Sequence, residues 1–277
     1  RVGTYWPITP AVDTVRNCMS ASTPNARKRR LLILLTVVLV TVTVEGLARI
    51  LGGTLVIPRL SFVFLQFDAH TLRNGHSAYL DDRDPVLGWP TKTALKTDAY
   101  GSGGARPSPS FLEPTAPCVT LFGDSFTYAS DVDDEHAWGE VLARQLNCRV
   151  ANYGVGGYGT DQALLRSKDV EALGRVSILG IHPENVLRNV NQYRGFLGDS
   201  PYTFKPRFLL EPDGELRLVS LPSLEEYELD LLFKEPTAVL PHESFLPGSR
   251  YGPVLWQAPY TLAMFRGFFH PRVTARL

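Results

Sequence analysis

The chain has 277 residues, of which 44% are hydrophobic, and its 28 basic side chains equal its 28 acidic ones in number. This neutral balance leaves no electrostatic footprint for nucleic acid, so we expect no nucleic-acid partner. The 21 prolines and 23 glycines indicate many turns and long connections, which argues against a helical bundle.

The N-terminal part reads as a basic tail, residues 1–30, whose last four residues are RKRR. The first methionine is Met19, and a polar start, a basic cluster and an apolar run follow it in that order. We therefore expect translation to begin at Met19, with residues 1–18 as upstream sequence.

An apolar stretch occupies residues 31–57 and is interrupted only by Glu45 and Arg49. It is long enough to cross a bilayer, which takes about 20 residues, and its two charged residues are spaced to pair on one helix face. A cleaved signal peptide is the nearest alternative, although no clean small-residue cleavage site follows Val44. A buried core helix is the third alternative, but it would not account for the four basic residues at the start of the stretch. We predict an uncleaved transmembrane anchor.

The basic cluster predicts the orientation of this anchor. Positive residues stay on the cytoplasmic side, so the bulk of the chain is expected on the extracytoplasmic (periplasmic) side of a cell membrane. Residues 58–115 are aromatic-rich and then turn-rich, and we interpret them as a juxtamembrane segment.

From residue 116 to residue 277 the pattern becomes regular and predicts the main domain. Apolar, strand-like runs alternate with helix-like ones, which is typical of a parallel sheet covered by helices on both faces. The expected strands are VTLFG, RVANYGV and VSILGI, and the expected helices are DVDDEHAWGEVLARQL and TDQALLRSKDVEAL. An insertion at about 204–221 contains Asp213 and Gly214 between alternating apolar residues, which predicts a two-residue hairpin turn.

Three cysteines, Cys18, Cys118 and Cys148, do not form a metal-binding pattern, and we expect neither a metal nor a cofactor. Cys118 and Cys148 each precede a predicted strand. If these strands are parallel neighbours, the two thiols lie at the same end and can bridge in an oxidising compartment. Two small buried hydrophobic side chains are the equal alternative.

Polar and glycine-rich residues follow each of the three predicted strands: GDS, then GVGGYG, then HPEN. Reactive groups gather at the carboxyl ends of parallel strands, so this coincidence predicts a site there. Ser125 is the candidate nucleophile, because a serine in a strand-to-helix turn projects its hydroxyl beside free backbone N–H groups. The alternative is a serine that serves only the turn.

Three segments carry a resemblance to a known family. FGDSFTY at 122–128, NYGVGGYGTDQ at 152–162 and SILGIHPENVLRN at 177–189 resemble the first three sequence blocks of the SGNH, or GDSL-type, hydrolases. The resemblance extends from about residue 116 to 194. It implies a three-layer α/β/α, flavodoxin-like fold and an activity that cleaves or transfers ester-linked acyl groups.

The same resemblance implies roles for residues. Ser125 would be the nucleophile and its own N–H an oxyanion donor, Gly157 would give the second donor, and an asparagine side chain the third. In a gapless register Glu184 occupies the asparagine position, and an ionised carboxylate cannot donate. We expect Asn185, one residue later, to point inward and take this role.

The catalytic histidine of the family comes from an Asp-x-x-His block near the C-terminus of the domain. His270, the histidine nearest the C-terminal end of this sequence, has Gly267 where the block requires an aspartate. We therefore expect the block beyond Leu277. Without a general base the serine hydroxyl is not activated, and this chain would bind better than it catalyses.

Two other patterns are interpreted as structural. Gly154, Gly156 and Gly159 match a G-x-G-x-x-G dinucleotide fingerprint, but Glu184 lies 30 positions after Gly154, where an acidic residue about 20 on is needed. The run from Asp133 to His136 could also suggest a metal site or a catalytic triad, but we expect it to cap a helix. Asp124 is expected to accept from local backbone donors.

The sequence thus predicts a membrane-anchored serine esterase or acyl (acetyl) transferase, acting on ester-linked acyl groups that an envelope carbohydrate would carry. The alternative is a catalytically inactive relative that binds glycan or a partner protein through the same cleft. The expected partners are the acyl-ester substrate and, through residues 31–57, the membrane.

Overall fold

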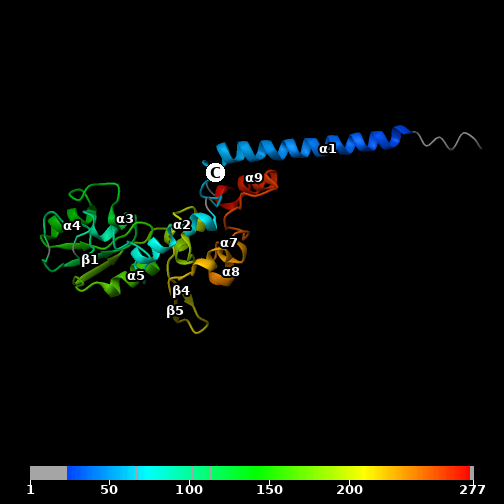
Figure 1. Cartoon of the computed structure of the whole chain (residues 1–277). Coiled ribbons are helices and arrows are strands. Elements are labelled where there is room, and N and C mark those ends of the chain that lie inside the picture. The colour runs from blue at the N-terminus through cyan, green and yellow to red at the C-terminus, as the bar shows by residue number, and fades with distance from the viewer. Residues whose placement is uncertain (1–23, 66–67, 102, 113, 275–277) are drawn as a thin grey trace, which may run out of the picture.

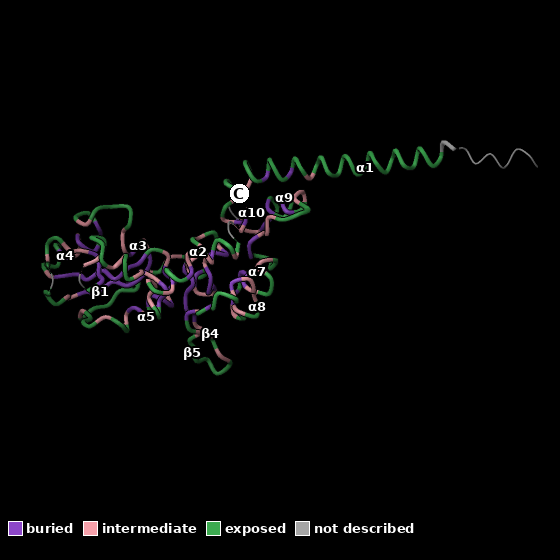
Figure 2. Tube along the Cα trace, in the orientation of Figure 1, coloured by how far each residue is buried: buried purple, intermediate pink, exposed green. Residues whose placement is uncertain are grey.

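The computed structural model describes residues 24–65, 68–101, 103–112 and 114–274. The predicted start of translation at Met19 lies outside these residues. A long helix, α1 (Pro24–Leu51), extends away from the rest of the chain and continues as a π-helical turn, Gly52–Val56 (Figure 1). Its apolar side chains are exposed along most of its length (Figure 2).

One helical span in the described part of the chain, Ala26–Val56, is long and apolar enough to cross a membrane, and only 6% of its most apolar window is buried by protein. The expected pairing of Glu45 with Arg49 is wrong. Glu45 accepts hydrogen bonds from the backbone N–H groups of Tyr260 (2.5 Å) and Thr261 (3.3 Å), and Arg49 lies over the Tyr260 ring. The carboxylate therefore caps the helix α9 (Tyr260–Phe268).

The predicted parallel sheet is confirmed. Strands β1 (Val119–Phe122), β2 (Val150–Asn152) and β3 (Val176–Leu179) are parallel and lie in the order β2-β1-β3. Val119 stands opposite both the first residue of β2 and the first residue of β3, so the carboxyl ends of all three strands meet at one edge.

Helices α4 (Trp138–Leu146) and α5 (Thr160–Asp169) cover opposite faces of this sheet beside β1 and β2. Leu121 packs with Ala143 of α4, and the next residue, Phe122, packs with Ala163 of α5, because successive side chains of a strand point to opposite faces. All four residues of β3 are exposed, so the three-layer arrangement stays a prediction.

The helix predicted to begin at residue 131 begins only at Trp138. Its N-cap residue is Ala137, and the expected cap by the acidic run is wrong. Asp133 hydrogen-bonds to His136, and Asp134 binds Arg106 (2.7 Å), so these carboxylates stabilise a loop in place of a helix terminus.

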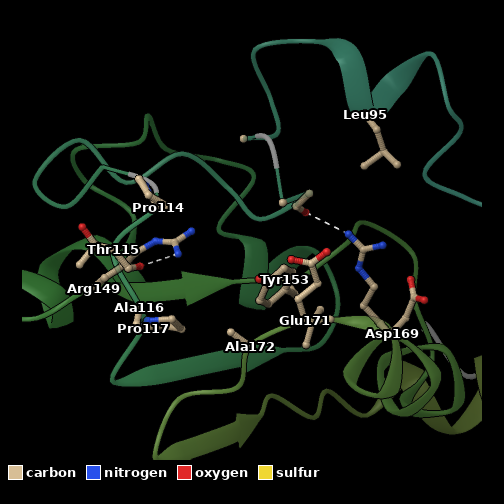
Figure 3. A pocket seen from close by; sticks show the side chains of 15 residues that line it. Leu95, Pro114, Thr115, Ala116, Pro117, Arg149, Tyr153, Asp169, Glu171 and Ala172 are labelled. Carbon is tan, nitrogen blue, oxygen red and sulfur yellow. Dashed lines mark hydrogen bonds between the residues drawn. The ribbon is translucent and has the colours of Figure 1, made fainter.

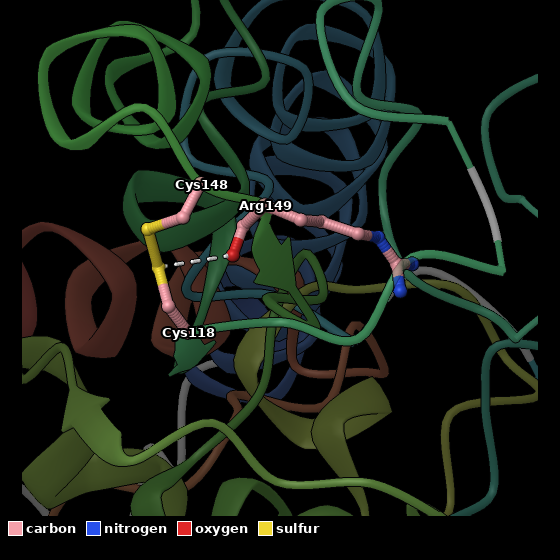
Figure 4. The surroundings of a disulfide bond; sticks show 3 residues. All are labelled: Cys118, Cys148 and Arg149. Atoms are coloured by element: carbon pink, nitrogen blue, oxygen red, sulfur yellow. Dashed lines mark hydrogen bonds between the residues drawn. A yellow bond between two sulfur atoms is a disulfide. The ribbon is translucent and has the colours of Figure 1, made fainter.

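A disulfide joins Cys118 and Cys148, which precede β1 and β2 (Figure 4). Their Cα atoms are 6.0 Å apart, and the backbone N–H of Cys118 donates to Arg149 O (2.9 Å). Of the two alternatives that the sequence leaves open, the bridge is therefore the one found. It ties the amino ends of two neighbouring strands together.

The rest of the chain packs around a second and larger apolar cluster. Residues 58–115 were interpreted as a juxtamembrane segment, but helix α2 (Ala69–Asp82) lies within them and contributes to this core. Its Leu72 and Tyr79 pack in the same cluster as Tyr193 and Phe204. The division into predicted domains stays a prediction. The remaining described helices are η3 (Ala94–Lys96), α3 (Ser125–Tyr128), α6 (Glu184–Asn189), η4 (Arg194–Leu197), η5 (Glu226–Leu229), α7 (Leu231–Lys234), α8 (Pro236–Val239) and α10 (Pro271–Thr274).

The predicted hairpin is formed by β4 (Arg207–Leu210) and β5 (Leu216–Val219). The predicted two-residue turn is wrong. Glu211 and Glu215 still pair through the backbone (2.8 Å), so the loop consists of the three residues between them. Gly214 has φ +89°, which is typical of a three-residue loop that ends in a left-handed residue.

Candidate active site

Ser125 is the first residue of α3, directly beyond the carboxyl end of β1. Gly123 carries the turn, with φ +155°, and a Cβ there would lie 2.1 Å from Thr127 Oγ1 and 2.9 Å from Gly180 O. Only glycine therefore fits between β1 and the following helix. Ser125 is half-buried, and its hydroxyl makes no hydrogen bond with the residues that the structure describes.

Asp124 is 1% exposed and is fixed by three donors. One carboxylate oxygen accepts from the Phe126 N–H (3.0 Å), which confirms the predicted local role. The other accepts from Asn185 Nδ2 (3.1 Å) and from Arg188 (2.9 Å). The buried charge is thus paired and hydrogen-bonded, and it connects the turn that carries Ser125 to helix α6.

The second strand end is the turn that contains Gly157, whose φ of +80° lies in the left-handed region. Its carbonyl accepts from Arg194 (2.8 Å), which fixes the orientation of the peptide group. Asn152 starts this segment: its side chain donates to Thr127 O (2.7 Å) and accepts from the Gly154 N–H (3.0 Å). The glycine turn is therefore held against the helix that begins with Ser125.

The glycines of the dinucleotide-like pattern are used by packing within the chain. A Cβ at Gly154 would lie 2.4 Å from the backbone nitrogen of Tyr128, and one at Gly159 would lie 2.4 Å from Asp161 Oδ1 and 2.6 Å from Asn189 Oδ1. Close packing within the chain thus accounts for Gly154 and Gly159, whereas a Cβ at Gly156 would meet no atom within 4 Å.

At the third strand end, Asn185 points inward and is 2% exposed, while Glu184 is exposed and pairs with Arg188 (2.9 Å). Both hydrogens of the Asn185 amide are engaged, one by Asp124 and one by Tyr158 O (2.9 Å). As an oxyanion donor Asn185 stays a prediction. In this structure Asn185 donates to Asp124 and thereby helps to position the residue before Ser125.

Arg106 is a residue that the sequence did not single out. Its guanidinium group is buried and donates to the carbonyls of Tyr128 (2.5 Å), Ala129 (2.6 Å) and Val132 (2.7 Å), as well as to Asp134. It thereby holds the loop that follows α3. No local pattern marks it, because its partners lie more than 20 residues further along the chain.

Asp133 and His136, in the run that was expected to cap a helix, have the Asp-x-x-His spacing that the resemblance places near the C-terminus of the domain. The two side chains are 2.5 Å apart, and the hydrogen bond from His136 lowers the pKa of the Asp133 carboxyl. Among the histidines that the structure describes, only His136 has a ring that hydrogen-bonds a carboxylate. His182 stacks on Phe126, next to Ser125 (4.4 Å between ring centroids).

A small pocket of about 240 Å³ opens beside Ser125, and the loop from Ala129 to Val132 forms its other side. No group of three or more metal-ligating side chains occurs in the described part of the chain.

A larger pocket of about 560 Å³ lies elsewhere and does not include Ser125 (Figure 3). Its two arginines are engaged by backbone carbonyls: Arg149 donates to Thr115 O (2.8 Å) and Arg166 to Gly104 O (3.1 Å). These two arginines therefore stabilise the loops around the pocket. Although this pocket is larger than the one beside Ser125, we do not take its size as a reason to prefer it as the candidate site.

No protein-family model matches the chain, and no curated protein matches it. Two solved structures are similar to part of it: AlinE4, described as an SGNH-hydrolase family esterase, and a mutant of the same esterase. Each alignment has 20% sequence identity and a TM-score of 0.24 and covers 31% of this chain. The chain spans about half (51%) of the length of these structures. At this TM-score the likeness determines neither the fold nor the activity.

Proposed function

We propose that the chain is a membrane-anchored serine esterase or acyltransferase of SGNH type. The observation that carries this proposal is the position of Ser125. It begins a helix at the carboxyl end of the central strand, its hydroxyl has no partner among the described residues, and the residue before it is locked by a buried ion pair.

In the proposed reaction the Ser125 hydroxyl oxygen attacks the acyl carbonyl carbon and loses its proton to a general base. The carbonyl oxygen becomes an oxyanion, which the N–H groups of Ser125 and Gly157 stabilise. The alcohol then leaves with a proton, and the acyl group on the serine passes to water in an esterase or to another hydroxyl in a transferase.

The anchor is the exposed apolar helix α1, with its basic start toward the cytoplasm and the sheet on the extracytoplasmic, periplasmic side. An acetyl group fits the small pocket beside Ser125, and an envelope carbohydrate is the acyl carrier that a protein in this position meets. No metal and no cofactor takes part in the proposed chemistry.

Hydrolysis of p-nitrophenyl acetate by the full chain in detergent tests the proposal. Ser125→Ala is expected to reduce the rate of p-nitrophenyl acetate hydrolysis to the uncatalysed background. Ser167→Ala is the matched control, because Ser167 lies on α5 outside the pocket and its hydroxyl donates to Leu164 O in the same helix, and its rate should stay near that of the parent chain. Equal rates for all three proteins would refute the nucleophile.

The same assay includes His136→Ala, because among the described histidines His136 is the one whose ring hydrogen-bonds a carboxylate, that of Asp133. A loss as large as that of Ser125→Ala would assign the base to His136. An unchanged rate would place the base in another residue.

One observation favours the alternative function, a binding module for glycan or a partner protein. The Asn185 amide, expected to stabilise an oxyanion, gives both of its hydrogens to protein acceptors. A chain that retains glycan binding in Ser125→Ala but shows no Ser125-dependent turnover would support this alternative.

A further inference from the structure

Glu45 identifies the side of α1 that does not face lipid. It lies within the apolar span, where an exposed carboxylate is costly. Its oxygens accept from two backbone N–H groups and one hydroxyl, all at the start of α9. Ala48, one turn later on α1, is buried at 8% exposure. Helix α9 therefore packs against α1 inside the stretch that the bilayer would surround.

The depth of this contact follows from the helix rise. If the hydrocarbon begins after the basic cluster at residues 27–30, about 20 residues cross it, and the far boundary falls near Ile50. Glu45 is five residues earlier, which at 1.5 Å per residue is roughly 8 Å below that boundary. Figure 1 shows α9 beside this last part of α1, with the sheet and its helices beyond the end of α1.

The outer face of α9 is uncovered and mostly apolar, and its one exposed charged residue is Arg266, whose long side chain can extend from the helix toward water. Leu262 is 43% exposed, Phe265 60% and Phe269 66%, and their spacing of three and four residues places them on one face of the helix. Ala263 and Gly267 are buried on the opposite face. The helix thus turns its small residues to the protein and its large apolar side chains outward.

Aromatic residues flank this helix at the end of the span. A Cβ at Gly52 would lie 2.1 Å from the Trp256 ring, so this ring packs directly on the π-helical turn. Trp256 also contacts Tyr260 (5.2 Å between centroids). Tryptophan and tyrosine at this level are typical of a membrane–water interface.

We propose that α9 is a second membrane contact, which inserts Leu262, Phe265 and Phe269 into the acyl-chain region of the outer leaflet beside α1. The inference rests on the proposed anchoring by α1 and is independent of the chemistry at Ser125. Lipid is the occupant, because the exposed face of α9 continues the exposed apolar surface of α1 at the same depth. Two contacts also limit how the domain rotates and tilts about its anchor.

Spin-label accessibility in vesicles of palmitoyl-oleoyl phosphatidylcholine tests this proposal. The full chain, with Cys18→Ser and its disulfide intact, carries one nitroxide through Phe265→Cys, Leu39→Cys on α1, or Leu210→Cys on the hairpin, where Leu210 is 73% exposed. We expect positions 265 and 39 to collide with oxygen more than with nickel-EDDA, and position 210 to do the reverse.

Lipid access at position 39 with water access at position 265 would overturn the proposal. Protection of position 265 from both reagents would overturn it too, because a second copy or another protein surface would then cover α9. Water access at position 39 would refute the anchor itself and with it this inference, while the ester assay would still decide the chemistry.

A second variant tests how α9 is held. Glu45→Leu in the chain labelled at position 265 removes the cap but keeps the apolar surface of α1. We expect nickel-EDDA collisions at position 265 to rise several-fold, because the start of α9 loses its acceptor. No change would overturn the assignment of Glu45 as the residue that positions α9.

Discussion

Single buried polar side chains determine how Ser125 is presented. Asp124 caps the turn on one side and reaches Asn185 and Arg188 on the other, so one carboxylate joins two strand ends. Neither partner is exposed by more than a tenth, and the interaction is therefore weakly screened. At this scale the serine is positioned by a charge pair that lies beneath it.

Arg188→Met tests this pair through stability. It removes the cation but leaves the buried carboxylate, which costs about 3 kcal/mol of unfolding free energy. Arg217→Ala is the control, since its pair with Glu211 is half exposed and contributes about 1 kcal/mol or less. Urea midpoints at constant slope measure both, and a smaller loss for Arg188→Met than for Arg217→Ala would contradict the buried-pair argument.

The glycine turn offers a matched pair for activity. Gly157→Ala places an L-residue at φ +80° and disturbs the N–H that is proposed to bind the oxyanion, so kcat should fall about a hundredfold. Gly156→Ala adds a methyl group with no atom within 4 Å and should leave kcat unchanged. Steady-state rates with p-nitrophenyl acetate compare the two, and equal effects would show that Gly157 has no special role.

At the scale of elements, the corner between α9 and α10 is held by His270. Its Nε2 lies 2.9 Å from Gly252 O, and its Nδ1 accepts from the Arg272 N–H (3.2 Å), so the neutral ring satisfies both neighbours. Burial lowers the pKa of His270, because the charged ring would lose its hydration. In the protonated ring, the Nδ1–H would point at the Arg272 N–H, which is itself a donor, so this hydrogen bond would be lost.

This arrangement predicts a pH-dependent corner. The folded pKa lies below the unfolded value of about 6.5, so the stabilisation is complete above that pH and is lost as the pH falls through the lowered folded value. Hydrogen exchange of the α9–α10 amides, corrected for intrinsic rates, should therefore accelerate on acidification. His270→Gln should remove the pH dependence, and a parent chain with pH-independent protection would refute the prediction.

At the scale of the whole molecule, the described sheet ends at β3 with an exposed apolar edge. Val176 is 53% exposed and Leu179 45%, whereas all residues of β1 and β2 are buried. An uncovered apolar edge strand is a template for pairing with another chain.

We expect this edge to cause self-association of the chain in detergent. Ile178→Lys, in the middle of β3, should raise the monomer fraction in sedimentation velocity by placing a charge in the contact. Leu112→Lys is the control, because Leu112 is 72% exposed and lies outside the sheet. Equal monomer fractions for both variants and the parent would show that β3 is not the contact.

The sequence was sufficient where the signal is local. Strand-to-helix alternation predicted the parallel sheet, the hydropathy of residues 31–57 predicted a span, and the GDS segment after the first strand predicted the turn that carries Ser125. These features depend on periodicity and on the backbone geometry of glycine, which neighbouring residues specify by themselves.

Contacts between distant segments were decided only by the tertiary structure. Glu45 caps a helix more than 200 residues away, Arg106 holds the loop after Ser125, and Asp133 and Asp134 stabilise that loop where a helix cap was expected. The reason is physical: a charged side chain near or within the core binds whichever donor or acceptor the fold brings to it, and sequence spacing does not encode that partner. Local pattern thus determined the strands of the sheet and the turn that carries the candidate nucleophile, and packing determined helix starts, helix caps and the contacts that hold these elements.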